Sequence, residues 1–241
     1  MECQDHRSFL LESWLELHDV IESHPQVRRL LFDPVTGLPT TPLLFPRIES
    51  LLAEHGEISL LCLSVVKYSK IEEIYGWEVF DQVMREVAVA LERITGAELR
   101  DSDMVAELMI SGNAFVVLLA PPRTTAAMVH ENLEKLALRV EQRVRDELAD
   151  VLGPAISPKF GCYVGSSTAH RDDKVRLERL VHRALEDALE DADRREACDA
   201  ECRKQRLEEI IAAEAVRTLV HPIYRLSDLG IIGYEALSRG P

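Results

Sequence analysis

The stretch Val105–Pro122 (VAELMISGNAFVVLLAPP) constrains the fold more than any other part of the chain. Two mostly apolar runs, Val105–Ile110 and Phe115–Ala120, flank the sequence Ser-Gly-Asn-Ala. Gly and Asn tolerate the positive φ angles of tight hairpin turns, so the pattern predicts a β-hairpin. Because nearly every residue of both strands is apolar, we expect helices on both faces of the sheet. The turn either links two core strands or presents a loop to a ligand.

Helices and strands alternate along the rest of the chain. The apolar spacing predicts helices over 5–24, 42–54, 71–94 and 124–152, strands over 59–66 and 157–166, and a long helix from about 172. After the first helix the order is α-β-α-β-β-α-β-α. This order indicates an α/β (α+β) fold with a mixed central sheet and helices on both faces. We assign residues 1–30 to an N-terminal helix and 31–195 to this domain.

The last part of the chain predicts a connector and a hairpin. No Gly or Pro occurs between Asp173 and Thr218, so a helix can leave the domain as a connector over residues 196–218. The connector is either a solvated spacer or a dimerising coiled coil, and the N-terminal helix offers a second surface for a homodimer. Residues 219–241 read as two strands around Ser227–Gly230. A hairpin alone is only marginally stable, so we expect it to be the start of a further domain.

Charge and cysteine usage exclude several classes of protein. The net charge of −14 disfavours binding to nucleic acid or anionic lipid. No apolar run approaches the roughly 20 residues of a membrane span, and the first residues do not form a secretory signal. Cys62 and Cys162 lie in apolar runs and are expected to be buried thiols, whereas Cys198 and Cys202 are one helical turn apart without the further ligands of a tetrahedral metal site. Five cysteines without a signal peptide favour the cytoplasm.

Several stretches resemble cyclic di-GMP signalling proteins. Asp33–Pro39 (DPVTGLP) resembles the first loop of GGDEF domains, the diguanylate cyclases that condense two GTP into cyclic di-GMP. Ser64–Trp77 (SVVKYSKIEEIYGW) is similar to the family's D-x-D-x-F-K-x-I-N-D-x-Y-G-H stretch, and Ser111–Phe115 (SGNAF) stands at the GGDEF signature. Gly233–Arg239 (GYEALSR) resembles the opening of EAL domains, which hydrolyse cyclic di-GMP. The resemblance implies a nucleotidyl-cyclase-like domain followed by the truncated start of an EAL domain over 219–241, as in a fragment of a longer protein.

The resemblance also implies that the GGDEF site is degenerate. Joining two GTP molecules needs a divalent metal held by carboxylate oxygens, but Ser64, Asn113 and Ala114 occupy the family's acidic positions. Glu72 replaces a guanine-contacting Asn, whereas Asp81 is retained. We therefore expect no catalytic residue and no cofactor in this chain. A remote alternative is an active cyclase with other acidic ligands. The degenerate positions are Ser64, Glu72, Asp81, Ser111, Gly112, Asn113 and Ala114.

Two further motifs suggest ligands. Arg100-x-x-Asp103 matches the inhibitory site at which cyclases bind cyclic di-GMP, because Arg can fork onto phosphate or guanine and Asp can accept guanine N–H groups. The same two residues could also be solvated loop charges. Glu235 matches a metal ligand of EAL domains, which would hold Mg²⁺ or Mn²⁺ only in a complete EAL domain.

These motifs indicate a bacterial signalling protein whose inactive GGDEF domain relays a signal to a downstream EAL domain. The full-length protein could then be a cyclic di-GMP phosphodiesterase. The alternative is a non-catalytic sensor of cyclic di-GMP or GTP.

Overall fold

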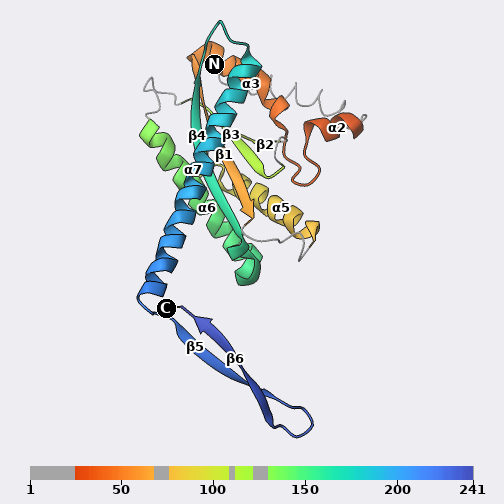
Figure 1. Cartoon of the computed structure of the whole chain (residues 1–241). Coiled ribbons are helices and arrows are strands. Elements are labelled where there is room, and N and C mark those ends of the chain that lie inside the picture. The colour runs from red at the N-terminus through yellow and green to blue at the C-terminus, as the bar shows by residue number, and fades with distance from the viewer. Residues whose placement is uncertain (1–24, 68–75, 109–111, 122–129, 241) are drawn as a thin grey trace. The chain divides into compact units, whose positions relative to one another are not determined.

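The structure is a computed structural model that describes residues 25–67, 76–108, 112–121 and 130–240 (Figure 1). The helix expected over 5–24 and the site positions Glu72 and Ser111 lie outside these residues. The chain divides into two compact units, Met1–Arg195 and Glu196–Pro241, which are described separately.

A four-stranded sheet in the order β2-β3-β1-β4 forms the centre of the first unit. Its strands are β1 (Glu57–Lys67), β2 (Met104–Glu107), β3 (Ala114–Leu119) and β4 (Phe160–His170). The expected hairpin is confirmed as β2 and β3, which pair from Met104↔Leu118 to Glu107↔Phe115. The expectation of a mixed sheet is wrong for the described strands, because all three pairings between them are antiparallel. Each helical connection joins two parallel strands, and one antiparallel strand lies between those two in the sheet. Parallel strands are therefore never neighbours among the described strands.

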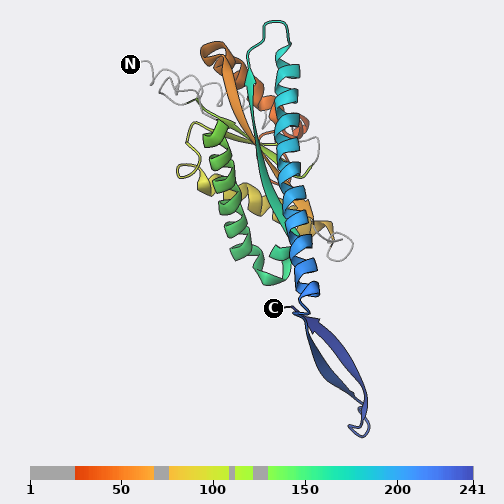
Figure 2. The same cartoon turned by 60° about the vertical axis from the view of Figure 1, so that its left-hand side comes forward.

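Helices cover both faces of this sheet, as expected (Figures 1 and 2). Alternation along β1 explains why: Leu61 and Leu63 belong to one apolar core, and Leu60 and Cys62 to the other. Helices α5 and α6 pack on the first core, whereas α3 and the first half of α7 pack on the second. The helical segments of the chain are α2 (Pro25–Leu31), η1 (Thr41–Leu44), α3 (Phe45–His55), α5 (Trp77–Ile94), α6 (His130–Ile156), η2 (Ser157–Lys159) and α7 (Leu177–Ala212).

Helix α7 begins later and ends earlier than the sequence suggests. It starts at Leu177 rather than near Asp172, because the Asp172 side chain accepts the Lys174 N–H and holds a turn there (2.9 Å). It ends at Ala212 instead of continuing to residue 218, and Glu214 adopts a left-handed φ of 49° before the next strand. The boundary between the two units falls inside this helix.

Gly165 of β4 marks the closest approach of α7 to the sheet. A Cβ built at this position would overlap the backbone of Ala188 and Ala192. Only glycine allows this contact, so the fit of α7 on the sheet depends on a single missing side chain.

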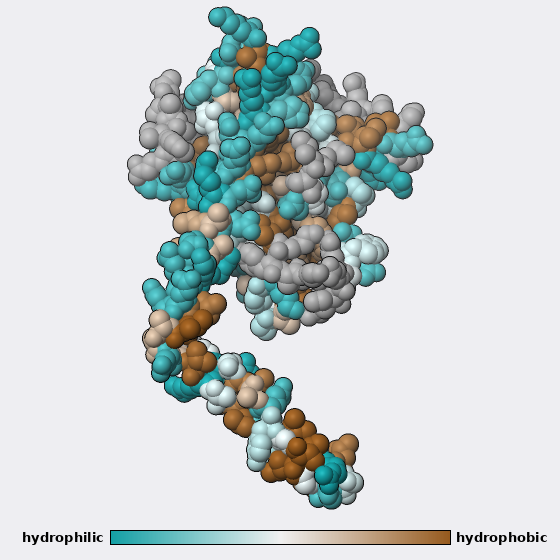
Figure 3. Space-filling model, viewed as in Figure 1, coloured by the Kyte–Doolittle hydropathy of each residue, from teal (hydrophilic) through white to brown (hydrophobic). Residues whose placement is uncertain are grey.

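The second unit contains the end of α7 and the hairpin β5 (Arg217–Tyr224) and β6 (Ile231–Arg239). This confirms two strands at the expected place. Many large apolar side chains of the hairpin are exposed (Figure 3), including Leu219, Val220, Ile223, Tyr224, Ile231, Ile232 and Tyr234. Among the described residues, no helix is both long and apolar enough to cross a membrane.

Candidate functional site

The turn before β3, at which the resemblance places a degenerate GGDEF signature, lies at one end of the central sheet. Ser64 sits near the end of β1, between Ala114 of β3 and Tyr163 of β4. By strand alternation Ser64 shares a face with Cys62, on the side that α3 and α7 cover. The structure therefore brings Ser64, Asn113 and Ala114 together, as the resemblance implies.

Asn113 and Ala114 take part in holding the fold together. The Asn113 side-chain amide donates a hydrogen bond to the Val65 carbonyl (2.9 Å), and the Val65 N–H donates to the Asn113 carbonyl (2.9 Å). These two bonds extend the β1–β3 ladder by one residue. The Ala114 methyl group is 1% exposed and belongs to the core beneath α3 and α7. The side chains at the two acidic positions of the family thus bind the backbone or pack in the core.

Asp81 lies in the second turn of α5, at the same end of the sheet. Its neighbour Phe80 stacks on Phe160, with ring centroids 6.4 Å apart. Phe160 pairs with Lys67, the last residue of β1. Asp81, which the resemblance makes a guanine contact, is therefore half-buried at this end of the sheet, while Glu72 lies outside the described residues.

The residues of this turn do not suit a divalent cation. Hard cations such as Mg²⁺ need several oxygen ligands, usually with one or two carboxylates. Ser64 offers a hydroxyl, Asn113 offers a neutral amide oxygen, and Ala114 offers no side-chain ligand, so none of the three supplies a carboxylate. Within the part of the chain that the structure describes, no group of three or more His, Cys, Asp or Glu side chains could hold a metal ion.

A second candidate site lies at the opposite end of β3. Here a pocket of about 300 Å³ opens between the loop before β2, the end of β3 and helix α6. The five residue steps of β3 separate it from the degenerate turn by about 17 Å. The residues around the pocket are Glu98, Arg100, Asp103, Leu119, Ala120, Asn132, Lys135, Leu136 and Arg139.

Asp103 fixes the shape of the loop beside this pocket. One of its carboxylate oxygens accepts the Arg100 N–H and the other accepts the Ala120 N–H, both at 2.8 Å. The Asp103 N–H in turn donates to the Arg100 carbonyl (3.0 Å). The loop is thereby tied to the end of β3, and the exposed Arg100 guanidinium is placed at the pocket. The two residues of the R-x-x-D motif therefore differ: Asp103 positions the loop, whereas the exposed Arg100 lines the pocket and its Nη1 donates to the Pro121 carbonyl at 3.5 Å.

Helix α6 adds two cations that the motif alone does not reveal. Lys135 and Arg139 are four residues apart and so lie on the same side of the helix, facing the pocket. Arg139 Nε pairs with Glu98 Oε2 at 3.0 Å. Three cationic and two anionic side chains thus surround a pocket in a protein whose overall charge is −14. Sequence reading missed the two α6 residues because only packing brings them beside the loop.

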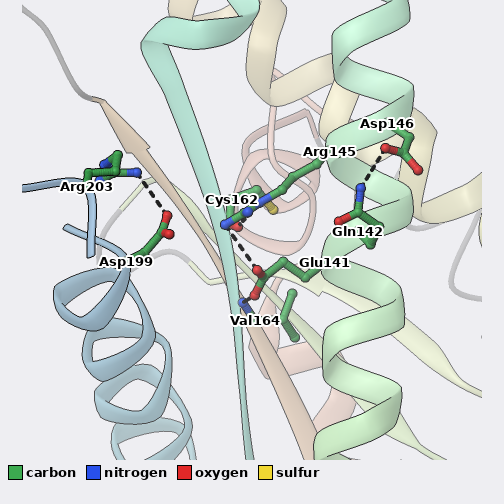
Figure 4. A network of polar contacts seen from close by, with 8 residues as sticks. All are labelled: Glu141, Gln142, Arg145, Asp146, Cys162, Val164, Asp199 and Arg203. Atoms are coloured by element: carbon green, nitrogen blue, oxygen red, sulfur yellow. Dashed lines mark hydrogen bonds and ion pairs between the residues drawn. The ribbon is translucent and has the colours of Figure 1, made fainter. Parts of the chain in front are cut away.

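Two carboxylates elsewhere in this unit, one buried and one half-buried, serve the fold. Figure 4 shows Glu141 of α6 accepting the Val164 N–H (3.0 Å) and pairing with Arg145 (3.1 Å), whose Nε donates to the Cys162 carbonyl (2.9 Å). On helix α7, the Asp191 carboxylate accepts the Ser166 N–H (3.0 Å). All three of these backbone partners belong to β4, an edge strand of the sheet. Side chains of α6 and α7 therefore hydrogen-bond to backbone groups that would otherwise face an open edge.

The charges of these groups follow from their surroundings. Burial alone would raise the pKa of Asp191, but the Ser166 N–H and the nearby Arg194 and Arg195 outweigh it and lower that pKa. Glu107, at the end of β2, is 5% exposed. Burial, and secondarily the charge of Asp33, raises the pKa of Glu107 to about 7.

Glu235, the predicted EAL ligand, is exposed on β6 of the second unit, opposite His221 of β5. These two side chains alone do not complete the ligand set of a divalent cation.

Comparisons with known proteins agree with the fold. The family described as "Diguanylate cyclase, GGDEF domain" matches residues 30–197. Diguanylate cyclase DgcP of Pseudomonas aeruginosa is 31% identical over 115 residues, which are 46% of this chain and only 16% of DgcP. Among solved structures, the diguanylate cyclase SiaD of the same organism, in complex with its activator SiaC, is 24% identical with a TM-score of 0.49, and the match covers 80% of this chain and 73% of SiaD.

The S helix-GGDEF-EAL part of LapD from Vibrio cholerae, bound to c-di-GMP, is 15% identical with a TM-score of 0.49. That match covers 91% of this chain and 51% of the LapD chain. Since the family match spans most of the sequence and the sheet has the expected hairpin and helical layers, the chain belongs to the diguanylate cyclase GGDEF-domain family.

Proposed function

We propose that the GGDEF domain of this chain is a cyclic di-GMP signalling module that does not synthesise cyclic di-GMP. The observation that carries this proposal is the degenerate turn. Asn113 has a neutral amide that donates to the β1 backbone and Ala114 is buried, so neither supplies a carboxylate for the metal that neutralises GTP. The family's remaining acidic position is occupied by Ser64, which has no carboxylate either. No cofactor is needed for such a role.

The relay role concerns the connector and the hairpin. In this proposal the domain regulates a downstream EAL domain through α7, whose last part leads into the β5–β6 hairpin. The exposed apolar side chains of the hairpin support this, because a two-stranded sheet needs further elements to be stable. Mg²⁺ or Mn²⁺ would bind at Glu235 only within a complete EAL domain. The cysteine usage favours a cytoplasmic location.

Turnover of GTP tests the absence of synthesis directly. The chain is incubated with GTP and Mg²⁺ or Mn²⁺, and cyclic di-GMP is quantified, with DgcP as the positive control. We expect no product above background. Formation of cyclic di-GMP by the unmodified chain, abolished by Asp81→Ala or Asp103→Ala, would show that other acidic residues replace the missing ligands and would refute the proposal.

A second candidate function is binding of cyclic di-GMP at the pocket beside Arg100. The observation that favours it is the meeting of Arg100 with Lys135 and Arg139, since a dianionic ligand needs local positive charge on an acidic protein.

Isothermal titration with cyclic di-GMP tests this binding. We expect Arg100→Ala to abolish it, because the guanidinium is the exposed group of the motif. Arg143→Ala removes the same charge from an exposed position of α6 outside the pocket, so it should bind normally. Silence of the unmodified chain, or equal loss in both variants, would exclude a sensor at this pocket.

A further inference from the structure

The second half of α7 carries a pair of thiols that the proposed function does not use. Cys198 and Cys202 are both exposed and lie four residues apart, so they occupy the same side of the helix. The Cys198 sulfur, and to a lesser extent the carboxylates of Asp199 and Glu201, raise the pKa of Cys202. The two thiols are thus neighbours on one side of the helix and open to small molecules.

The other two described cysteines of the domain provide a contrast. Cys62 and Cys162 lie in the core, 0% and 1% exposed, and burial raises the pKa of the Cys62 thiol to about 12. A buried thiol with so high a pKa forms little thiolate, which is the reactive form. Among the four described cysteines, chemical modification should therefore select the pair on α7.

We infer that Cys198 and Cys202 form a modification site at which a low-molecular-weight disulfide oxidises the two thiols to an intramolecular disulfide. One cysteine thiolate attacks a sulfur of the reagent, forms a mixed disulfide and releases one reagent thiol. The second thiolate attacks the protein sulfur of that mixed disulfide, closes the Cys198–Cys202 bond and releases the second reagent thiol. The protein loses two electrons and two protons, which reduce the reagent to two thiols.

Closing this disulfide distorts the helix. Residues four apart on a helix have Cβ atoms about 5–6 Å apart, whereas a disulfide holds them at about 3.5–4.5 Å. The Cβ atoms must therefore approach by roughly 1–2 Å, which an intact helical turn does not permit.

This part of α7 can yield because, in the part of the chain that the structure describes, its side chains are exposed rather than packed in a core. Every residue from Ala200 to Glu209 is exposed. Ion pairs along the helix, Asp199–Arg203 at 2.9 Å and Glu201–Lys204 at 3.7 Å, add little to its stability. A helical segment without tertiary packing is only marginally stable in water, so oxidation should unwind about one turn, roughly four residues.

The experiment equilibrates the whole chain in buffers of reduced and oxidised glutathione, followed by acid quenching, alkylation and trypsin. Cleavage after Arg195 and Arg203 releases both cysteines in one peptide, Glu196–Arg203. We expect this peptide to lose two hydrogen atoms in oxidising buffer, while Cys62 and Cys162 stay alkylatable after unfolding. Far-ultraviolet circular dichroism should show the loss of roughly one helical turn, restored by reductant.

Cys198→Ser is the matched control. It should accept a single glutathione at Cys202 and keep its helical signal, since no ring can close. The inference is overturned if the peptide stays reduced or cross-links only between chains. It is also overturned if the disulfide forms without a change in ellipticity, or if Cys198→Ser loses the same signal. None of these readouts depends on cyclic di-GMP, so they leave the proposed function untouched.

Discussion

Removing the Glu141 carboxylate should destabilise the domain more than any substitution of a surface ion pair. Glu141 is 9% exposed, and its carboxylate holds both the Val164 N–H and the Arg145 guanidinium. Glu141→Ala leaves the Val164 N–H without its acceptor on the edge strand. It also leaves Arg145 bound only to the Cys162 carbonyl and stacked over the Tyr163 ring at 4.8 Å.

The expected loss follows from two contributions. A hydrogen bond from a backbone N–H to a buried carboxylate contributes about 1.5–3 kcal/mol. The ion pair adds about 0.2–1 kcal/mol, because the Arg145 side chain is 35% exposed. Together we expect Glu141→Ala to lower the free energy of unfolding by about 2–4 kcal/mol, a large part of a typical stability of about 5–15 kcal/mol. Urea denaturation with an unchanged m-value measures this loss.

Glu147→Ala provides the matched control on the same helix. Glu147 pairs with Arg93 at 2.9 Å, but both side chains are more exposed than Glu141, and no backbone N–H of the described residues donates to that carboxylate. Its removal should cost at most about 1 kcal/mol. Glu141→Gln keeps an acceptor for the Val164 N–H and should fall between the two. If Glu141→Ala costs no more than Glu147→Ala, the edge-capping argument is wrong.

Two further predictions concern glycine packing and pH. Gly165→Ala places a methyl group against the backbone of Ala188 and should destabilise the domain by about 1–3 kcal/mol or more. Gly233→Ala, which has open space around the added Cβ, should be nearly neutral. Thermal melts that rank the two variants the other way would contradict this account of the packing. The folded-state pKa of Glu107 is raised to about 7, so between the ordinary value of 4.5 and 7 the folded state binds more protons than the unfolded state, and stability falls as pH rises through that window. Glu107→Gln should remove this slope and stabilise the protein at pH 8 by up to about 3 kcal/mol, and an unchanged slope in urea titrations from pH 4 to 8 would refute the assignment.

Local patterns were enough to predict most elements of the fold. The apolar runs around Gly112-Asn113 predicted the hairpin, and β1 was predicted to within about two residues at its start and one at its end. Helix α7 was predicted as a long helix, but its ends were misplaced, because a side-chain turn at Asp172 and a left-handed residue at Glu214 decide them. The antiparallel pairing of the strands was not predicted, because local sequence patterns do not reveal which strands become neighbours in the sheet.

The sequence by itself determined which side chains stand at the turn before β3, because the identities of Ser64, Asn113 and Ala114, none of them a carboxylate, are read directly from it. Only the tertiary structure decided that Asn113 hydrogen-bonds to the β1 backbone. It also decided that Asp103 holds a loop while Arg100 lines a pocket together with residues of α6. The physical reason is range: turn and helix preferences act between neighbours in sequence, whereas pockets and strand caps form between residues that only packing brings together.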